Sequence, residues 1–167
     1  MNTSLLKKNI SNIKLSKSNS NINFFASKNS FLDRNFSSIK DVVLEIQKVG
    51  ENEFGLLPEQ FKLTKEKNIN SQFISLDNGI LLINSFFKEL KKNCLIFFRL
   101  EKPILYDIEK STDIIFTLIT PCSIKTSSKL QILAKLTRIL KNPNIRKEIK
   151  GVKKAEDVLA LLLLPST

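Results

Sequence analysis

The stretch TDIIFTLITP, residues 112–121, decides the fold class of this chain. Between Asp113 and Thr120 it is almost wholly apolar, which is typical of a core strand that is covered on both faces. The run CLIFFRL, residues 94–100, predicts a second core strand of the same kind. After Pro121 the apolar residues recur at a helical period instead. The sequence therefore predicts a buried sheet that is followed by a helical C-terminal third.

A strand and two helices are expected ahead of this core. Residues 31–36 predict an edge strand. Ser37 and Ser38 offer N-caps for a helix that begins directly afterwards, and Gly50 is its expected end. A second, short helix is expected to start near Pro58 and to carry Phe61 and Leu63 inward.

The segment between this short helix and the core strands predicts more of the sheet. The run from Ile74 to Ile83 is strand-like and is interrupted by Asp77-Asn78-Gly79, which is a good turn signal. Further along, Glu101-Lys102-Pro103 is expected to connect two strand segments.

The last part of the chain predicts three helical segments. Asn142-Pro143 is expected to start the second one, Gly151 to end it, and residues 155–163 to form the third. We therefore expect residues 26–167 to form a single layered α/β domain, with a central mixed sheet flanked by helices. The first of the three helices is expected to bury a stripe of Leu130, Leu133, Leu136 or Thr137, and Leu140.

Composition indicates a folded but strongly basic protein. The 167 residues are 42% hydrophobic, the net charge is +11 and the isoelectric point is about 9.7. Most of the cations are lysine, and Lys, Asn and Ile are abundant together, as in an AT-rich genome. The interpretation that we favour is therefore a solvated basic surface that has drifted with codon usage. Contact with nucleic acid or with another acidic partner is the alternative, although specific readout usually relies on Arg.

The two cysteines, Cys94 and Cys122, lie in separate apolar stretches and form no metal-binding spacing. Both are expected to be buried free thiols, which fits a reducing compartment. No run reaches the roughly 20 apolar residues that a membrane span requires. We expect no metal and no cofactor.

Residues 1–32 contain no acid and carry five lysines among many Ser and Asn residues. Residues 1–25 therefore predict either an organellar targeting segment or a basic tail on a cytosolic protein. Both interpretations stay open, so the expected location is the cytoplasm of a bacterium or the matrix of an organelle.

Histidine is absent from the whole chain. Its absence excludes imidazole general bases, Ser-His-Asp triads, Cys-His dyads and histidine metal ligands. Ordinary proton shuttling near neutral pH is therefore not expected.

Four stretches, in this order, resemble one bacterial family. They are LDRNFSSIKDVVLEI (32–46), LTKEK leading to NGILLIN (63–84), LEKPILYD leading to TDIIFTLITP (100–121), and LQILAKLTRILKNPNIRKEIKGVKKAEDVLALL (130–162). Their order and spacing resemble enzyme IIA of the phosphotransferase system, in its fructose/mannitol and nitrogen-regulatory branch. The resemblance covers about 130 residues and implies the fold expected above.

The resemblance also implies where a phosphoryl site would lie. In the family, a histidine at the end of the Asn-Gly signature takes a phosphoryl group from the phosphocarrier protein HPr and passes it on. Asn84 stands at that position here, after Asn78 and Gly79 of the same signature. A second, assisting histidine of the family corresponds to Lys129, and an arginine of the family corresponds to Lys65.

Three hypotheses for function follow from this resemblance. The first is a catalytically inactive regulatory module that is locked in the unphosphorylated state and binds protein partners, an HPr-like protein among them. Its docking surface would comprise Ser85, Phe86, Phe87 and Lys88 beside Asn84. The second is a structural subunit of an organellar or endosymbiont complex, with its basic tail against acidic protein or RNA. The third is a residual phosphoryl carrier that uses another nucleophile.

Overall fold

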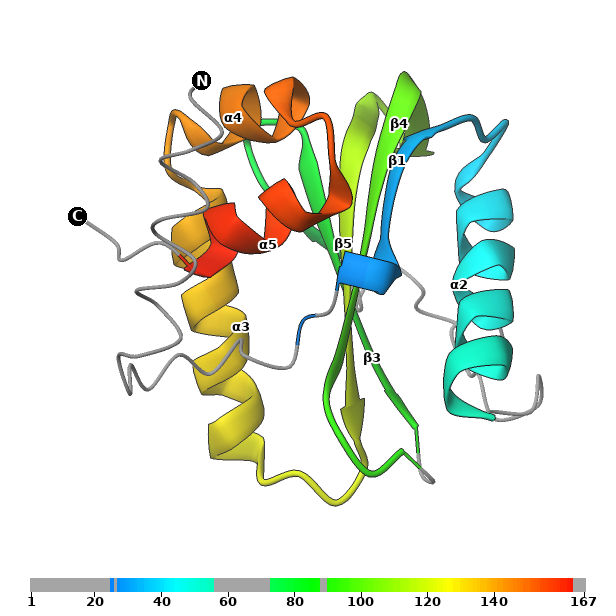
Figure 1. Ribbon diagram of the computed structural model, residues 1–167, viewed down its shortest axis with the longest axis vertical. Helices are drawn as coiled ribbons and strands as arrows, with labels where there is room; N and C mark the ends of the chain where they lie inside the picture. The colour runs from blue at the N-terminus through cyan, green and yellow to red at the C-terminus, as the bar shows by residue number, and fades with distance from the viewer. Residues whose placement is uncertain (1–24, 26, 56–72, 88–89, 164–167) are drawn as a thin grey trace.

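A computed structural model describes residues 25, 27–55, 73–87 and 90–163, and Figure 1 shows them as a sheet between two helical layers. The strand order across the sheet is β1-β4-β5-β3-β2. β1 pairs parallel with β4 and β3 parallel with β5, while the β4–β5 and β2–β3 pairs are antiparallel. The predicted mixed sheet is therefore confirmed. Its strands are β1 (Ser30–Arg34), β2 (Phe73–Ser75), β3 (Ile80–Phe87), β4 (Cys94–Asp107) and β5 (Lys110–Pro121).

The helices divide between the two faces of the sheet (Figure 1). One face packs against α2 (Ile39–Phe54), and the other packs against α3 (Thr126–Leu140), α4 (Ile145–Gly151) and α5 (Ala155–Leu163). A short 3-10 turn, η1 (Ser27–Asn29), leads into β1. Phe25 is buried in the core beneath α3, α4 and α5, so the folded part includes this residue of the expected tail.

Strand β3 shows how the sequence assigns side chains to the two layers. Because successive side chains of a strand point to opposite faces, Leu81 and Ile83 lie in the core under α2. Ile80 and Leu82 lie in the core under α3, α4 and α5. The next residue of this second series is Asn84.

Several predicted boundaries are confirmed. Ser38 is the N-cap of α2, and its hydroxyl accepts a hydrogen bond of 3.3 Å from the amide of Asp41. Gly79 closes the turn before β3, with its amide 3.1 Å from the carbonyl oxygen of Leu76. Gly151 ends α4, and α5 occupies residues 155–163 as expected.

Gly50 does not end the first helix. Helix α2 runs through it to Phe54, and Gly55 is the C-cap in the left-handed conformation, with φ of 63°. Gly50 is buried beside Val49, which packs into the core. Since burial of this face favours the helix, the stop falls at the next glycine, where the chain can turn away.

The predicted connection at Glu101-Lys102-Pro103 is also wrong. Strand β4 continues through these residues to Asp107, and its register with β5 shifts between Arg99 and Ile104. A bulge of this kind accommodates Pro103, which has no amide hydrogen to donate to the ladder.

The helical third differs from prediction in two details. Leu130 is 59% exposed, and the buried positions of α3 are Ile132, Leu136, Ile139 and Leu140. Helix α4 begins at Ile145, because a turn comes first in which the Asn142 side chain accepts the amide of Asn144 at 3.0 Å. The helix expected near Pro58, with Phe61 and Leu63, lies outside the described residues.

The two cysteines do not share one environment. Cys94 is buried as expected, whereas Cys122 is exposed in the turn after β5, so the expected burial of both thiols is wrong for Cys122. Burial raises the pKa of the Cys94 thiol to about 12, with a smaller opposing effect of the Lys28 charge. Cys94 is therefore protonated and unreactive at neutral pH.

Candidate functional site

Asn84 lies near the carboxyl end of β3, opposite Leu118 of β5. It is half-buried, and it follows Leu82 on the face that carries α3. Its side-chain oxygen is buried and accepts no hydrogen bond within the described structure. Buried polar atoms are usually hydrogen-bonded, so this oxygen is an acceptor left without a partner among the described residues.

Helix α3 begins at the same end of the sheet, where β3 and β5 end. Helix α3 follows β5 after residues 122–125 and runs back along the sheet, and Figure 1 shows the end of β5 and the start of α3 together at the lower edge. At the opposite edge the side-chain nitrogen of Asn78 donates 2.7 Å to the carbonyl oxygen of Leu140.

Lys129 and Asn84 lie at comparable distances, along their own elements, from the contact between Asn78 and Leu140. Asn84 is about 20 Å along the strand from Asn78, at 3.3 Å per residue. Lys129 is about 16 Å along the helix from Leu140, at 1.5 Å per residue. Both residues are half-buried.

Asn78 and Gly79 lie at the other end of β3. At about 3.3 Å per residue, Gly79 is about 16 Å from Asn84 along the strand. They have structural roles there. Asn78 caps the last turn of α3 through Leu140. Gly79 has a φ of +79°, and a Cβ at this position would lie 3.3 Å from Nη1 of Arg146. The structure therefore does not bring these two residues together with Asn84 and Lys129.

The expected docking surface is described only in part. Ser85 is 3% exposed and points toward the α2 core, so its side chain is not available to a partner. Its carbonyl oxygen accepts the hydroxyl of Thr120 at 3.5 Å. Phe86 and Phe87 continue β3 opposite Thr120 and Pro121. Their side chains lie outside the described structure, as do Lys65 and Lys88.

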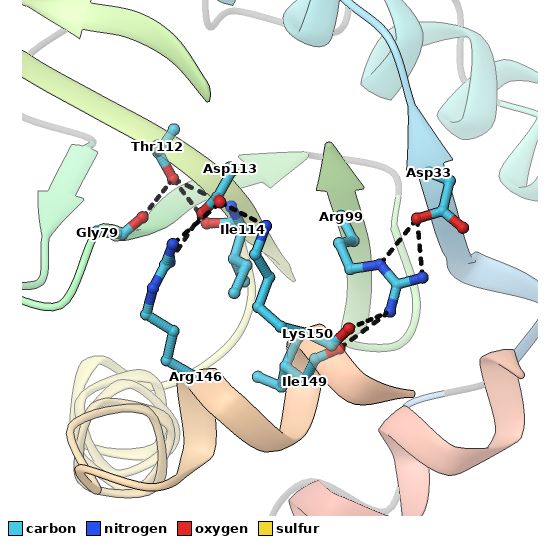
Figure 2. A network of polar contacts seen from close by, with 9 residues as sticks. All are labelled: Asp33, Gly79, Arg99, Thr112, Asp113, Ile114, Arg146, Ile149 and Lys150. Atoms are coloured by element: carbon cyan, nitrogen blue, oxygen red, sulfur yellow. Dashed lines mark hydrogen bonds and ion pairs between the residues drawn. The ribbon is translucent and has the colours of Figure 1, made fainter. Parts of the chain in front are cut away.

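Sequence reasoning missed a buried guanidinium at the other end of the sheet, level with Ile80 and not with Asn84. Arg99, in the middle of β4, has a side chain that is 9% exposed and points under α4 (Figure 2). Its Nη1 donates to the carbonyl oxygens of Ile149, Lys150 and Val152, at 3.1, 3.2 and 2.6 Å. Its Nε and Nη2 donate to Asp33, which is 64% exposed. Arg99 therefore caps the carboxyl end of α4, where a positive charge is favourable.

A second ion-pair group attaches α4 to β5. Both carboxylate oxygens of Asp113 accept hydrogen bonds from Arg146, at 2.8 and 3.0 Å, and Lys150 also binds Asp113 (Figure 2). Burial raises the pKa of Asp113, but the hydrogen bonds and charges of Arg146 and Lys150 outweigh it, so the pKa lies below its ordinary value. The sequence does carry a signal for both groups, since Arg99 and Asp113 are charged residues within apolar runs.

Two classes of site find no support in the described residues. No group of three His, Cys, Asp or Glu side chains among them could hold a metal ion. None of the helices in the described segments is long and apolar enough to span a bilayer.

The comparisons with known proteins agree with this architecture. Residues 23–164 match the family model described as phosphoenolpyruvate-dependent sugar phosphotransferase system, EIIA 2. No curated protein matches the sequence significantly.

Solved structures show the same fold. Nitrogen regulatory protein IIA-Ntr from Neisseria meningitidis is 24% identical with a TM-score of 0.73, over 83% of this chain and 96% of that one. The mannitol IIA of Escherichia coli is 13% identical with a TM-score of 0.64, over 82% and 97%. A complex of E. coli enzyme IIA-Mtl with phosphorylated enzyme IIB-Mtl gives the same identity and score, over 83% and 97%.

Proposed function

Since the chain belongs to the EIIA 2 family of the phosphoenolpyruvate-dependent sugar phosphotransferase system, we propose that it is a member that cannot be phosphorylated and acts by binding proteins. The observation that carries this proposal is Asn84, which stands where the resemblance puts the phosphoryl-accepting histidine, in a chain without any histidine. The lone pair of an amide nitrogen is delocalised into its carbonyl group. Asparagine can donate a hydrogen bond to a phosphate but cannot accept a phosphoryl group as imidazole does.

Other nucleophiles near this edge do not replace the histidine. Ser85 is buried, and Cys94 is held protonated by burial. Cys122 is exposed, but the chain has no imidazole that could activate its thiol. These features support a domain that stays permanently in one state, the unphosphorylated one.

The protein-binding role is supported by the side chains available at this end of the sheet. Asn84 offers a half-buried amide with a free acceptor, and Leu130, one turn into α3, is an exposed apolar side chain. A related IIA domain forms a complex with a IIB domain. We infer that the present chain uses the corresponding edge, with Phe86, Phe87 and Lys88 beside Asn84, to hold a protein partner such as an HPr-like protein.

Phosphorylation is tested by intact-mass spectrometry after incubation with phosphoenolpyruvate, enzyme I and HPr. We expect wild type to gain no phosphoryl group, and Cys122→Ser to behave identically. The variant Asn84→His restores the missing imidazole, so a phosphoryl group on it alone would show that the edge still receives HPr. A phosphoryl group on wild type would refute the proposal, and its loss in Cys122→Ser would identify the carrier.

Docking is tested by affinity capture from native cells with three forms of the full chain. Asn84→Arg places a long cation in the proposed surface, whereas Ser111→Arg introduces the same side chain at an exposed position near the β4–β5 turn. We expect one stoichiometric partner with wild type and Ser111→Arg, and its loss with Asn84→Arg. Recovery of the same partners with all three forms would show that this edge is not the docking surface.

A further inference from the structure

Charge is segregated between the two faces of the sheet. Helix α2 carries two lysines against four acids (Asp41, Glu45, Glu51 and Glu53). On the other face, residues 122–154, which include α3 and α4, contain one acid, Glu148, and α5 adds Glu156 and Asp157. The described helices of the two layers therefore differ in their balance of acids and cations. The same segment 122–154 carries ten cations, namely Lys125, Lys129, Lys135, Arg138, Lys141, Arg146, Lys147, Lys150, Lys153 and Lys154.

Five of these cations lie in or directly beside helix α4 and are here called the basic corner: Arg138, Lys141, Lys147, Lys153 and Lys154. All five are exposed, and none makes an ion pair within the described part of the chain. They occupy the end of α3, helix α4 and the turn before α5, and α4 contacts both neighbouring helices. Since α4 has seven residues, the backbone segments that carry the five charges are joined by a helix only about 10 Å long.

The basic corner is built on a fixed support. Helix α4 is attached to β5 through Asp113 and to β4 through Arg99, as described above (Figure 2). Arg146 and Lys150 neutralise Asp113, which leaves Lys147, the one other lysine of α4, free to meet an external anion.

The lack of aromatic residues around the basic corner indicates which class of partner it binds. Residues 122–154 contain no aromatic residue. Single-stranded nucleic acid is normally held by stacking its bases on aromatic side chains. Helices that bind membranes need a large apolar face, often with Trp or Phe, and protein interfaces rely on Trp, Tyr and Arg anchors. The four lysines and Arg138 of the basic corner suit evenly spaced phosphates, which lysines contact as point charges.

We propose that the basic corner binds the phosphate backbone of double-helical nucleic acid without reading its sequence. Each phosphate contact releases counterions, so the logarithm of the association constant falls with the logarithm of salt at about 0.9 per contact. Five contacts give a slope of about −4.5, which is about a 500-fold loss of affinity between about 50 and 200 mM salt. This inference depends on the charge distribution and not on Asn84, so it stands or falls separately from the proposed function.

The test is fluorescence anisotropy of a labelled DNA duplex of about 20 base pairs, titrated with the full chain across this salt range. The triple variant Lys141→Gln, Lys147→Gln and Lys154→Gln should make the slope shallower by about 3, since each lost contact removes about 1. The control triple, Lys40→Gln, Lys91→Gln and Lys92→Gln, removes the same charge from exposed positions elsewhere. It should leave the slope unchanged.

Different results would overturn the inference. Equal effects of the two triples would mean that binding follows total charge. Discrimination between two duplexes of unrelated sequence would show base readout instead of backbone contact. The protein could instead bind neither duplex but bind another acidic probe, with that binding lost in the basic-corner variant. Such binding to polyglutamate would assign the surface to an acidic protein, and such binding to phosphatidylserine vesicles would assign it to a membrane. Thermal unfolding, followed by circular dichroism, checks that both triple variants are folded. The triple variant Lys141→Gln, Lys147→Gln and Lys153→Gln is a second test of the basic corner.

Discussion

Replacing Arg99 by methionine isolates the contribution of the buried guanidinium. Methionine preserves much of the apolar stem but removes the donors, so the carbonyl oxygens of Ile149, Lys150 and Val152 lose their partner. Each buried acceptor that is left unsatisfied costs about 1–3 kcal/mol. Water reaches part of this helix end, so we expect the free energy of unfolding to fall by about 3–5 kcal/mol, as when one partner of a buried pair is removed.

Two matched variants separate the helix cap from the ion pair. Arg138→Met makes the same replacement at an exposed position of α3 and should change the free energy of unfolding by no more than about 0.5 kcal/mol. Asp33→Asn removes the charge that faces Arg99, but Asp33 is 64% exposed. Its loss should cost less than about 1 kcal/mol, because water screens the pair.

The assay is equilibrium unfolding in urea, with the midpoint and slope fitted for each variant. The reasoning fails if Arg99→Met lowers the free energy of unfolding by less than about 1 kcal/mol, the mean value of an ordinary substitution. It also fails if Asp33→Asn is as damaging as Arg99→Met, because the ion pair and not the helix cap would then dominate.

Three further outcomes are expected. The pKa of Asp113 is lowered in the folded state, so its ion pairs stabilise the fold above the unfolded pKa of about 3.9 and this stabilisation is lost as pH falls through the folded value. The difference in free energy of unfolding between wild type and Asp113→Asn should therefore become smaller below about pH 4. A difference that urea titrations show to be independent of pH would contradict this. Gly79→Ala should destabilise by about 1–2 kcal/mol because φ is +79° and a guanidinium lies 3.3 Å from the new Cβ. Gly151→Ala, which meets no atom within 4 Å, is the control and should be neutral or slightly stabilising. A thiol reagent at pH 8 should modify Cys122 but not Cys94 in the native protein, and both after unfolding; rapid native labelling of both would contradict the burial of Cys94.

The sequence was sufficient for the sheet because its signals are local. Continuous apolar runs predict β4 and β5, and the Asn78-Gly79 pair predicts the turn that begins β3. The end of α2 was misplaced because Gly50 and Gly55 carry the same local signal. They differ in that Gly50 is buried in the fold and Gly55 is exposed, which the local sequence does not show.

The candidate site was predicted from the resemblance to enzyme IIA, which supplies the positions of Asn84 and Lys129. The roles of Asn78 and Arg99 could not be predicted, because their partners are distant in sequence: Leu140 is 62 residues from Asn78, and Ile149 is 50 from Arg99. The charge segregation is visible in the sequence, but the basic corner becomes a surface only once α4 is placed across α3 and α5.

The order of strands in the sheet has a consequence for how the chain folds. β4 and β5 are the two longest strands, and they are adjacent in both the chain and the sheet, joined through the turn at Ile108 and Glu109. Closing this hairpin costs little loop entropy, whereas β1 must find β4 from more than sixty residues away. We therefore expect the hairpin to form early, with β3 and then β1 adding to its two edges as slower, non-local steps. The end of the sheet where Asn84 lies would then form only when β3 pairs with β5, after the hairpin.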